Sequence, residues 1–405
     1  MPFRALCLLL LATLSACGIS QPAIPVARFT QGDLGVVADF ARKEATAGPV
    51  ENQALLFNVL AQCELLQGDI DAAWQHFGAA ARVMGNWQTS GSEEFSAIVG
   101  SESSKGYTGD PYEKAMNAYY LGMCYLLKGE PDNARAAFKK GILADGESGD
   151  EKYQADFTLL FWLAGRMSRA MGLPADAEDF FKEAKKADEF ARSHGSRGES
   201  NNQLLRSPEI GNLVVLAEVG MGPEKVAAGN EGELARFRPR WSSAHRAQVW
   251  IDGELRGPTW ILADVDYQAR TRGGTEMEGI RQGKAVFKSI TRTAGVGALL
   301  LAAGDTSSTG ARDKALVGAG LLVLSALTAA KADTRHWPTL PSTVQGAAFD
   351  VAPGQHTLRI DFLSSSGQIL SDLTQTWTVD VPERGESYFI FRSLPRMDRI
   401  PRSKP

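Results

Sequence analysis

The sequence has little of the chemistry on which enzymes and metal proteins depend. It contains five histidines in 405 residues, and none has a second His or Cys at the spacing of a metal site. The His-Glu-x-x-His motif and the Gly-x-Ser-x-Gly nucleophile elbow are absent. The stretch from Gly279 to Ala285 suggests a phosphate loop, but Glu278 stands where its first Gly is needed and Ala285 replaces the Mg²⁺-holding Ser or Thr. We therefore expect no metal, no cofactor and no enzymatic activity.

Strong charge and long hydrophobic runs are also lacking. The formal net charge is −4, so the chain has no basic field to gather nucleic acid, and we expect no nucleic-acid partner. The apolar run from Ala5 to Ala12 is shorter than the roughly 20 residues that span a bilayer. With 44% hydrophobic and 22% charged residues, the composition is that of a globular protein with room for two or three domains.

The first residues have the order of a bacterial export signal. One positive charge, Arg4, precedes the apolar run, and small residues follow it. The segment Leu14-Ser15-Ala16-Cys17 resembles the lipobox of bacterial lipoproteins, in which the Cys takes a diacylglycerol and becomes the new N-terminus. The resemblance implies a signal peptide at 1–16, lipidation of Cys17 and a tether at 17–26. Gly18 in place of Asp resembles outer-membrane sorting, so we expect an outer-membrane anchor and a protein that faces the periplasm.

One pattern of residues recurs three times before residue 195. A small residue lies seven positions before each central Gly, and an alanine and a phenylalanine lie five and nine positions after it. The three sets are Phe57, Ala61, Gly68, Ala73 and Phe77; Ala118, Gly122, Gly129, Ala134 and Phe138; and Phe161, Gly165, Gly172, Ala177 and Phe181. This is the spacing of the tetratricopeptide repeat (TPR), whose two antiparallel helices meet at the small residues while the aromatics fill the space between pairs. We therefore predict TPR-like helical repeats over 27–195.

Other signals support the helical prediction. Each central Gly stands where a left-handed residue ends a helix. The segment from Asp110 to Glu113 offers an N-cap, a first-turn Pro and an acidic first-turn residue, so a helix is expected to begin there. The Gly- and Ser-rich insertion 85–109 is either a surface loop or a partner-binding loop over the concave face. Cys63 and Cys124 are expected in helices, either as a disulfide or as two buried thiols.

Beyond a polar linker at 196–211 the pattern becomes that of strands. Short apolar or alternating runs occur at 212–220, 248–251, 356–362, 373–381 and 387–391. The fragments Val249 to Thr259 and Val351 to Ile360 resemble the two halves of a PEGA-type β-sandwich module; the alternative is two unrelated hairpins. The resemblance implies one β domain in two parts, 212–272 and 335–395, with an insertion at 273–334 and a basic tail at 396–405.

The insertion is rich in Gly and Ala. Its apolar stretches within 291–330 predict a helical hairpin that packs inside the protein or an oligomer, or that enters a membrane in part. Two polar segments, Asp264 to Arg272 and Asp333 to Trp337, flank the insertion. They are expected either to form ion pairs with each other at the hairpin base or to form a solvated rim.

The expected fold is α+β and multidomain, with N-terminal TPR-like repeats and a small antiparallel β-sandwich-like domain interrupted by an apolar helical hairpin. The lipobox, the Tyr112 to Gly122 segment and the segments flanking the hairpin resemble an uncharacterised family of TPR-like bacterial envelope lipoproteins. The expected function is a non-enzymatic, lipid-anchored periplasmic scaffold whose repeats offer a concave face to protein partners in an envelope assembly. Two alternatives are an oligomeric secretion or export component that uses the hairpin in the membrane, and an envelope enzyme or glycan-binding module.

Overall fold

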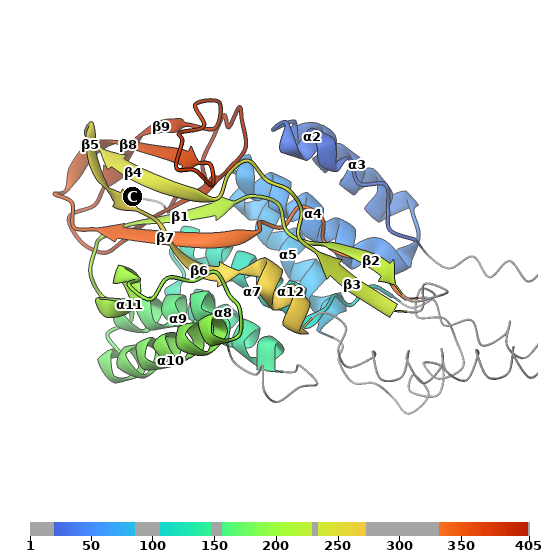
Figure 1. The fold of residues 1–405 in the computed structure, drawn as a ribbon, viewed down its shortest axis with the longest axis horizontal. Helices are drawn as coiled ribbons and strands as arrows, with labels where there is room; N and C mark the ends of the chain where they lie inside the picture. The colour runs from blue at the N-terminus through green and yellow to red at the C-terminus, as the bar shows by residue number, and fades with distance from the viewer. Residues whose placement is uncertain (1–19, 86–105, 147–155, 229–233, 273–331, 404–405) are drawn as a thin grey trace, which may run out of the picture.

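Helices make up the N-terminal half of the chain and strands most of the C-terminal half, which confirms the expected α+β class (Figure 1). The computed structural model describes residues 20–85, 106–146, 156–228, 234–272 and 332–403. The signal peptide, Cys17, most of the 85–109 insertion and the predicted 291–330 hairpin lie outside the described residues.

The helices form successive antiparallel pairs because tight glycine turns join them. Gly68, Gly129 and Gly172 have φ of +79°, +81° and +73°, the left-handed conformation that ends a helix. The pairs are α4 with α5, α7 with α8, and α9 with α10. The helices are α2 (Val26–Thr30), α3 (Leu34–Ala47), the 3₁₀ helix η1 (Val50–Asn52), α4 (Gln53–Leu66), α5 (Ile70–Met84), α7 (Pro111–Leu127), α8 (Pro131–Gly146), α9 (Thr158–Ala170), α10 (Pro174–Ser193) and the short α11 (Gln203–Arg206).

The small residues of the repeat lie where the two helices of a pair come closest. A Cβ added at Gly122 would lie 2.4 Å from Cε1 of Phe138, and one added at Gly165 would lie 2.4 Å from Cε1 of Phe181. Each phenylalanine therefore packs directly on the glycine of its own pair. Replacing the glycine would force the ring out of its packed position.

The strands form two four-stranded sheets and a separate hairpin. The first sheet has the order β10-β1-β7-β6, and in it β1 pairs parallel with β10; the second has the order β5-β4-β8-β9. The strands are β1 (Leu213–Val219), β2 (Glu224–Ala228), β3 (Leu234–Arg238), β4 (Arg246–Ile251), β5 (Glu254–Pro258), β6 (Trp260–Asp264), β7 (Thr343–Phe349), β8 (Gly354–Leu363), β9 (Gln375–Val381) and β10 (Ser387–Arg392). Strands β2 and β3 form the hairpin, and α12 (Val265–Arg272) follows β6.

Successive side chains of β1 point to opposite faces of the first sheet, and both faces are covered. Val214 and Leu216 belong to a buried cluster shared with the helices, whereas Leu213, Val215 and Ala217 belong to a second cluster shared with the other sheet. The first sheet is therefore the middle layer, with helices on one face and the second sheet on the other (Figure 1).

The two PEGA-like fragments lie side by side in the second sheet. In the antiparallel pairing of β4 with β8, Val249 lies opposite Ile360 and Trp250 opposite Arg359. The alternative of two unrelated hairpins is therefore wrong, because the fragments are hydrogen-bonded neighbours. Assignment to the PEGA class stays a prediction.

The described part of the basic tail folds back on the sheet edge. Arg402 forms an antiparallel bridge with Phe389, and the amide of Ile390 donates to the carbonyl of Pro401 at 3.0 Å. The cysteine alternatives are also resolved: Cys63 and Cys124 are both free and buried. Burial raises the pKa of both thiols well above the ordinary range.

Because Phe181 packs directly on Gly165, we expect a methyl group added at position 165 to destabilise the protein. Gly165→Ala should lower the free energy of unfolding by roughly 1–3 kcal/mol, the usual cost of overpacking. Gly78→Ala in α5 is the matched control: its added Cβ meets no atom within 4 Å, so higher helix propensity should raise stability by up to about 1 kcal/mol. Urea unfolding of both variants tests this, and a Gly165→Ala midpoint equal to the wild-type midpoint would contradict the packing.

Candidate functional site

The concave face expected to receive a partner is already occupied by the chain itself. Almost every residue of α4 and α7 is buried, and so is most of α9. Their buried side chains share one cluster with Val214, Leu216 and Trp337 from the C-terminal half. The prediction of an open concave face over these helices is therefore wrong. The reason is visible in the sequence of α4, which carries apolar residues on all its sides, as expected of a helix covered on two faces.

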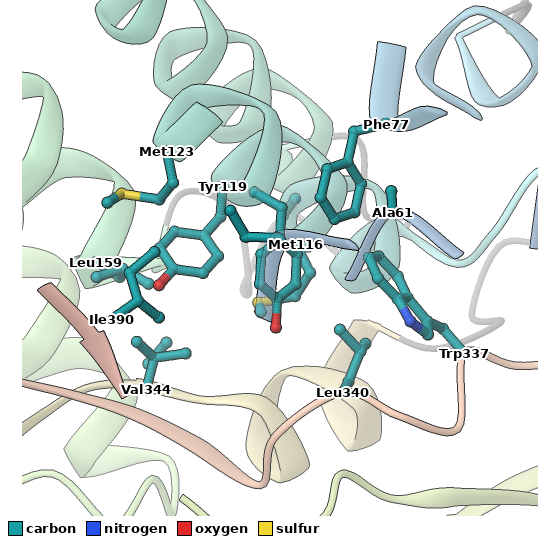
Figure 2. Close-up of a cluster of buried hydrophobic side chains, with 14 of the residues drawn as sticks. Ala61, Phe77, Met116, Tyr119, Met123, Leu159, Trp337, Leu340, Val344 and Ile390 are labelled. Atoms are coloured by element: carbon teal, nitrogen blue, oxygen red, sulfur yellow. The ribbon is translucent and has the colours of Figure 1, made fainter. Parts of the chain in front are cut away.

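An extended segment, residues 333–341, contacts the inner helices; we call it the strap. Its central residue, Trp337, is 1% exposed and packs against Phe77 of α5 and Tyr120 of α7, with ring centroids 6.1 and 5.5 Å apart. Figure 2 shows Trp337 beside Phe77, with Leu340 further along the same segment. The strap therefore places a large aromatic side chain between the first two helical pairs.

Gln62 of α4 binds the strap through both ends of its amide. Its Oε1 accepts hydrogen bonds from the indole of Trp337 at 3.1 Å and from the hydroxyl of Thr339 at 2.5 Å. Its Nε2 donates to the carbonyl of Thr339 at 3.1 Å and to the hydroxyl of Tyr120 at 2.8 Å. A buried amide with this many partners aligns the strap in one register, because a shift would leave polar groups unpaired.

The carboxylate of Glu113 joins the strap to the start of α7. One oxygen accepts the backbone N–H of Trp337 at 2.6 Å, and the other accepts the N–H of Asp110 at 2.8 Å and so completes a capping box. Burial, and next the negative charge of Asp110, raise the pKa of Glu113 to about 7. Lys225 of β2 opposes this shift, and its ammonium lies 2.7 Å from Asp110.

The strap also binds the start of the described chain. The amide of Gln21 accepts from the backbone N–H of His336 at 2.9 Å and donates to its carbonyl at 3.1 Å. Burial lowers the pKa of His336 to about 4, so its ring is neutral at pH 7. The neutral Nε2 accepts from the guanidinium of Arg240, 3.1 Å away. Gln21, His336 and Arg240 therefore form one contact chain.

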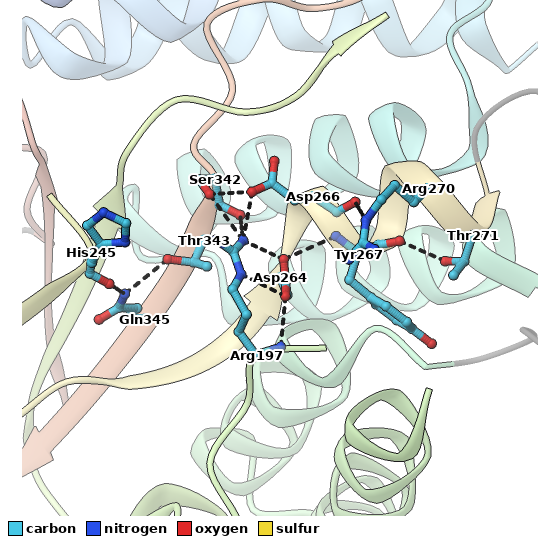
Figure 3. A network of polar contacts seen from close by, with 10 residues as sticks. All are labelled: Arg197, His245, Asp264, Asp266, Tyr267, Arg270, Thr271, Ser342, Thr343 and Gln345. Atoms are coloured by element: carbon cyan, nitrogen blue, oxygen red, sulfur yellow. Dashed lines mark hydrogen bonds and ion pairs between the residues drawn. The ribbon is translucent and has the colours of Figure 1, made fainter. Parts of the chain in front are cut away.

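The expected ion pairs between the segments that flank the hairpin do not occur among the described residues. Asp264 and Asp266 instead bind Arg197, whose Nη2 lies 2.5 and 2.8 Å from their carboxylates (Figure 3). The carboxylates are 1% and 5% exposed, so the solvated-rim alternative is also wrong. Arg335, in turn, pairs with Asp333 at 2.6 Å. Sequence reasoning missed Arg197 because it lies in the polar stretch assigned as linker 196–211, where nothing distinguishes it from a surface residue.

Two opposite charges are buried where the middle sheet meets α7. Glu218 and Arg392 lie opposite each other on β1 and β10, and both are fully buried. Arg392 donates to the strap carbonyls of Thr339 and Leu340 at 3.2 and 3.3 Å. Burial raises the pKa of Glu218 to about 7, although Arg392 and two tyrosines of α7 oppose the shift.

Most of the predicted repeat residues pack among the helices or lie at turns and do not contact the strap. Phe77 touches Trp337. The three central glycines lie at turns, where Gly129 and Gly172 are exposed and Gly68 is half-buried. The remaining members pack inside or between the helical pairs: Ala61, Ala73, Gly122, Ala134, Phe138, Phe161, Gly165 and Ala177 are buried, and Phe57 and Phe181 are partly buried. Within the described part of the chain, no group of three or more His, Cys, Asp or Glu side chains could hold a metal ion.

An open cleft of about 400 Å³ lies at the last helical pair. Pro174, Ala177 and Phe181 supply apolar lining from α10. Cationic side chains outnumber acidic ones in the rest of the lining: Arg169, Lys182, Lys185 and Arg206 against Glu178 and Glu209. Lys182 is paired with Glu178 at 2.8 Å, whereas Lys185 and Arg206 are exposed. The cleft thus combines an apolar surface with accessible cations, which suits a protein segment with apolar and acidic side chains.

The comparisons with known proteins identify no family. No family model matches the chain, and no curated protein matches it. Two crystal structures of MamA are among the solved structures that match. One has 17% identity and a TM-score of 0.29 over 41% of this chain and 75% of that chain; the other has 19% and 0.22 over 42% and 92%. At these TM-scores the likeness carries no argument.

The described geometry itself defines the class, an α+β protein whose TPR-like helical pairs pack on a two-sheet β layer. None of the helices in the described ranges has the length and apolarity needed to cross a membrane.

The buried carboxyl of Glu218 predicts how stability depends on pH. Its pKa is about 7 in the folded protein against an ordinary value of 4.5, so between these values the folded state holds a proton that the unfolded state has released. The stability due to this group is fully present below pH 4.5 and is lost as the pH rises through 7. Glu113 acts in the same direction. His336, whose pKa is lowered to about 4, acts in the opposite direction up to its ordinary pKa of 6.5, and the two carboxyls together outweigh it. The urea concentration at the unfolding midpoint of the wild type should therefore decrease as the pH is raised from 5 to 7.5.

Glu218→Gln should make that fall smaller, because the amide does not ionise. Glu254→Gln, at an exposed position of β5, is the matched control and should retain the wild-type slope. Equal slopes for Glu218→Gln and the wild type would show that Glu218 is not a source of the pH dependence.

Proposed function

We propose that this protein is a non-enzymatic scaffold, anchored by lipid on Cys17 to the outer membrane, that faces the periplasm and binds a protein partner of the envelope. The cleft at the last helical pair is the observation that carries the proposal. The strap and the middle sheet cover the inner helices, so partner binding is assigned to the outer surface of the repeats. The partner supplies a segment with apolar and acidic side chains.

Two features support an interaction role. Helical pairs in series present a rigid, extended surface, as repeat architectures commonly do. The last pair, α9 with α10, has no further pair packed on it in the described chain, so Phe181 keeps part of its ring accessible beside Pro174 and Ala177.

The lipid anchor is supported by the lipobox and by the way the chain begins. Two residues lie between Cys17 and Ser20, and the three chain steps reach at most about 10 Å when extended. Gln21 is then bound to the strap, so the start of the folded part is tied down rather than carried on a long linker. A lipid on Cys17 would hold this end of the molecule close to the membrane.

Charge reversal at the cleft tests partner binding. Lys185→Glu combined with Arg206→Glu should reduce at least tenfold the amount of partner crosslinked in intact cells and identified by mass spectrometry, because two cations facing an acidic segment become two repulsive anions. Lys139→Glu with Lys140→Glu, at exposed positions of α8, makes the same charge change elsewhere and should leave the crosslinks unchanged.

Neither pair of substitutions removes a buried side chain, so unfolding is not expected to explain a loss. Equal crosslinking by both double variants and the wild type would reject the cleft as the binding surface. The absence of any crosslinked protein in the wild type would reject the scaffold role itself.

Replacing the lipidated cysteine tests the anchor. Cys17→Ser should move the protein from the membrane fraction to the soluble periplasmic fraction, because the acyl chains make an effectively permanent attachment. Cell fractionation with immunoblotting measures the distribution. Ser15→Thr, which leaves Cys17 in place, is the matched control. A Cys17→Ser protein that stays wholly with membranes would show that lipid on Cys17 is not the anchor.

A further inference from the structure

Trp241 is the most exposed large hydrophobic side chain in the described part of the chain, with 87% of its surface accessible. It lies just after β3, before the chain enters β4. Tryptophan combines a large apolar ring with one N–H donor, which makes it a favoured side chain at boundaries between apolar and wet surroundings. An indole this exposed is a candidate contact for something outside the chain.

Cationic side chains accompany Trp241. Arg236 and Arg238 are exposed and alternate along β3 with Phe237, so the two arginines share one face of the strand. Phe237 lies on the other face and packs edge-on against Tyr112, with ring centroids 5.5 Å apart. This packing orients the hairpin so that its arginines face outward.

Among the described residues, the ion pair that these exposed arginines form is weak. The guanidinium of Arg238 lies 4.0 Å from the carboxylate of Glu224, and both side chains are at least half exposed. Such a pair contributes little in water. The arginine face of β3 therefore keeps a net positive charge available to an anionic surface.

The described start of the chain lies close to Trp241. Arg240 precedes it and donates to His336, and His336 is held by both ends of the Gln21 amide. Gln21 is four residues from Cys17 in the sequence, and hydrogen bonds through His336 connect it to Arg240, the residue before Trp241. A membrane that holds the lipid on Cys17 is thus within reach of this surface.

We propose that Trp241, with Arg236 and Arg238, is a second membrane contact that inserts the indole at the headgroup level of an anionic lipid surface. The inference rests on the proposed lipid anchor, which brings the surface to the membrane. Arginine guanidinium groups bind lipid phosphates, and the indole enters the boundary between headgroups and acyl chains. The contact sets the orientation of the repeats relative to the membrane, since a lipid tether alone leaves the protein free to rotate.

Fluorescence quenching tests the contact in the full lipidated protein. The protein is placed in vesicles of brominated phosphatidylcholine with phosphatidylglycerol, and the emission of a Trp241→Phe variant is subtracted to isolate Trp241. The Trp241 emission should shift to the blue and be quenched relative to vesicles with ordinary acyl chains. Vesicles of phosphatidylcholine alone should quench it less, and added salt should weaken the quenching.

Arg236→Gln and Arg238→Gln test the cationic part. Each should shift the equilibrium between contacting and free Trp241 roughly fivefold toward the free state, the typical effect of one arginine at an anionic surface. Lys139→Gln with Lys140→Gln removes two charges from α8 instead and should leave the quenching unchanged.

The experiment distinguishes failure of this membrane contact from failure of the proposed lipid anchor. Mass spectrometry reports whether Cys17 carries lipid, and a Trp241 emission that is unquenched in a lipidated protein overturns the membrane contact alone. A blue shift that appears only when an envelope protein is added would assign Trp241 to a protein partner, and would also overturn the proposal. Quenching that Arg236→Gln and Arg238→Gln leave unchanged would remove the role of the arginines.

Discussion

The apolar surface of the inner repeat helices has to be buried, and the rest of the structure depends on this constraint. Nearly all side chains of α4 and α7 are buried, on every side of each helix. The neighbouring helices alone do not cover all of this surface. The middle sheet and the strap supply the remaining cover, and Trp337 fills the space between two helical pairs. Gln62 and Glu113, which are buried at this interface, have hydrogen-bond partners in the strap. Burial without such pairing would cost more than the apolar contacts contribute.

Local sequence signals predicted the local structure well. The three turn glycines adopt left-handed conformations, and α7 begins at Pro111, where the helix start was predicted from Asp110 to Glu113. The strands β1, β4, β8, β9 and β10 overlap the predicted runs. These features depend on residues a few positions apart, so periodicity and turn chemistry are enough to find them. The β2–β3 hairpin and α12 were not predicted, because their short segments carry mixed signals.

The site was much harder to predict, because its contacts join distant parts of the chain. Trp337 meets Glu113 across 224 residues and Gln62 across 275, and no periodic pattern specifies such partners. Arg197 reads as a loop residue until Asp264 and Asp266 are seen around it. One signal did point to the covered inner face: α4 carries apolar residues on all its sides, whereas a repeat helix with an open concave side would carry a continuous polar stripe.

The parallel pairing of β1 with β10 has a consequence for how the protein is made. Residues 213–218 pair with 387–392, and Arg392 also binds the strap, so the middle sheet is complete only when nearly the whole chain is present. A chain synthesised from its N-terminus contains the repeat helices first, and the apolar surface that Trp337 and β10 later cover is then still exposed. Contacts of such long sequence separation form slowly, and bare apolar surface promotes aggregation in the meantime. The repeat helices are therefore the part of a newly made chain that is most exposed to aggregation until the last strand is available.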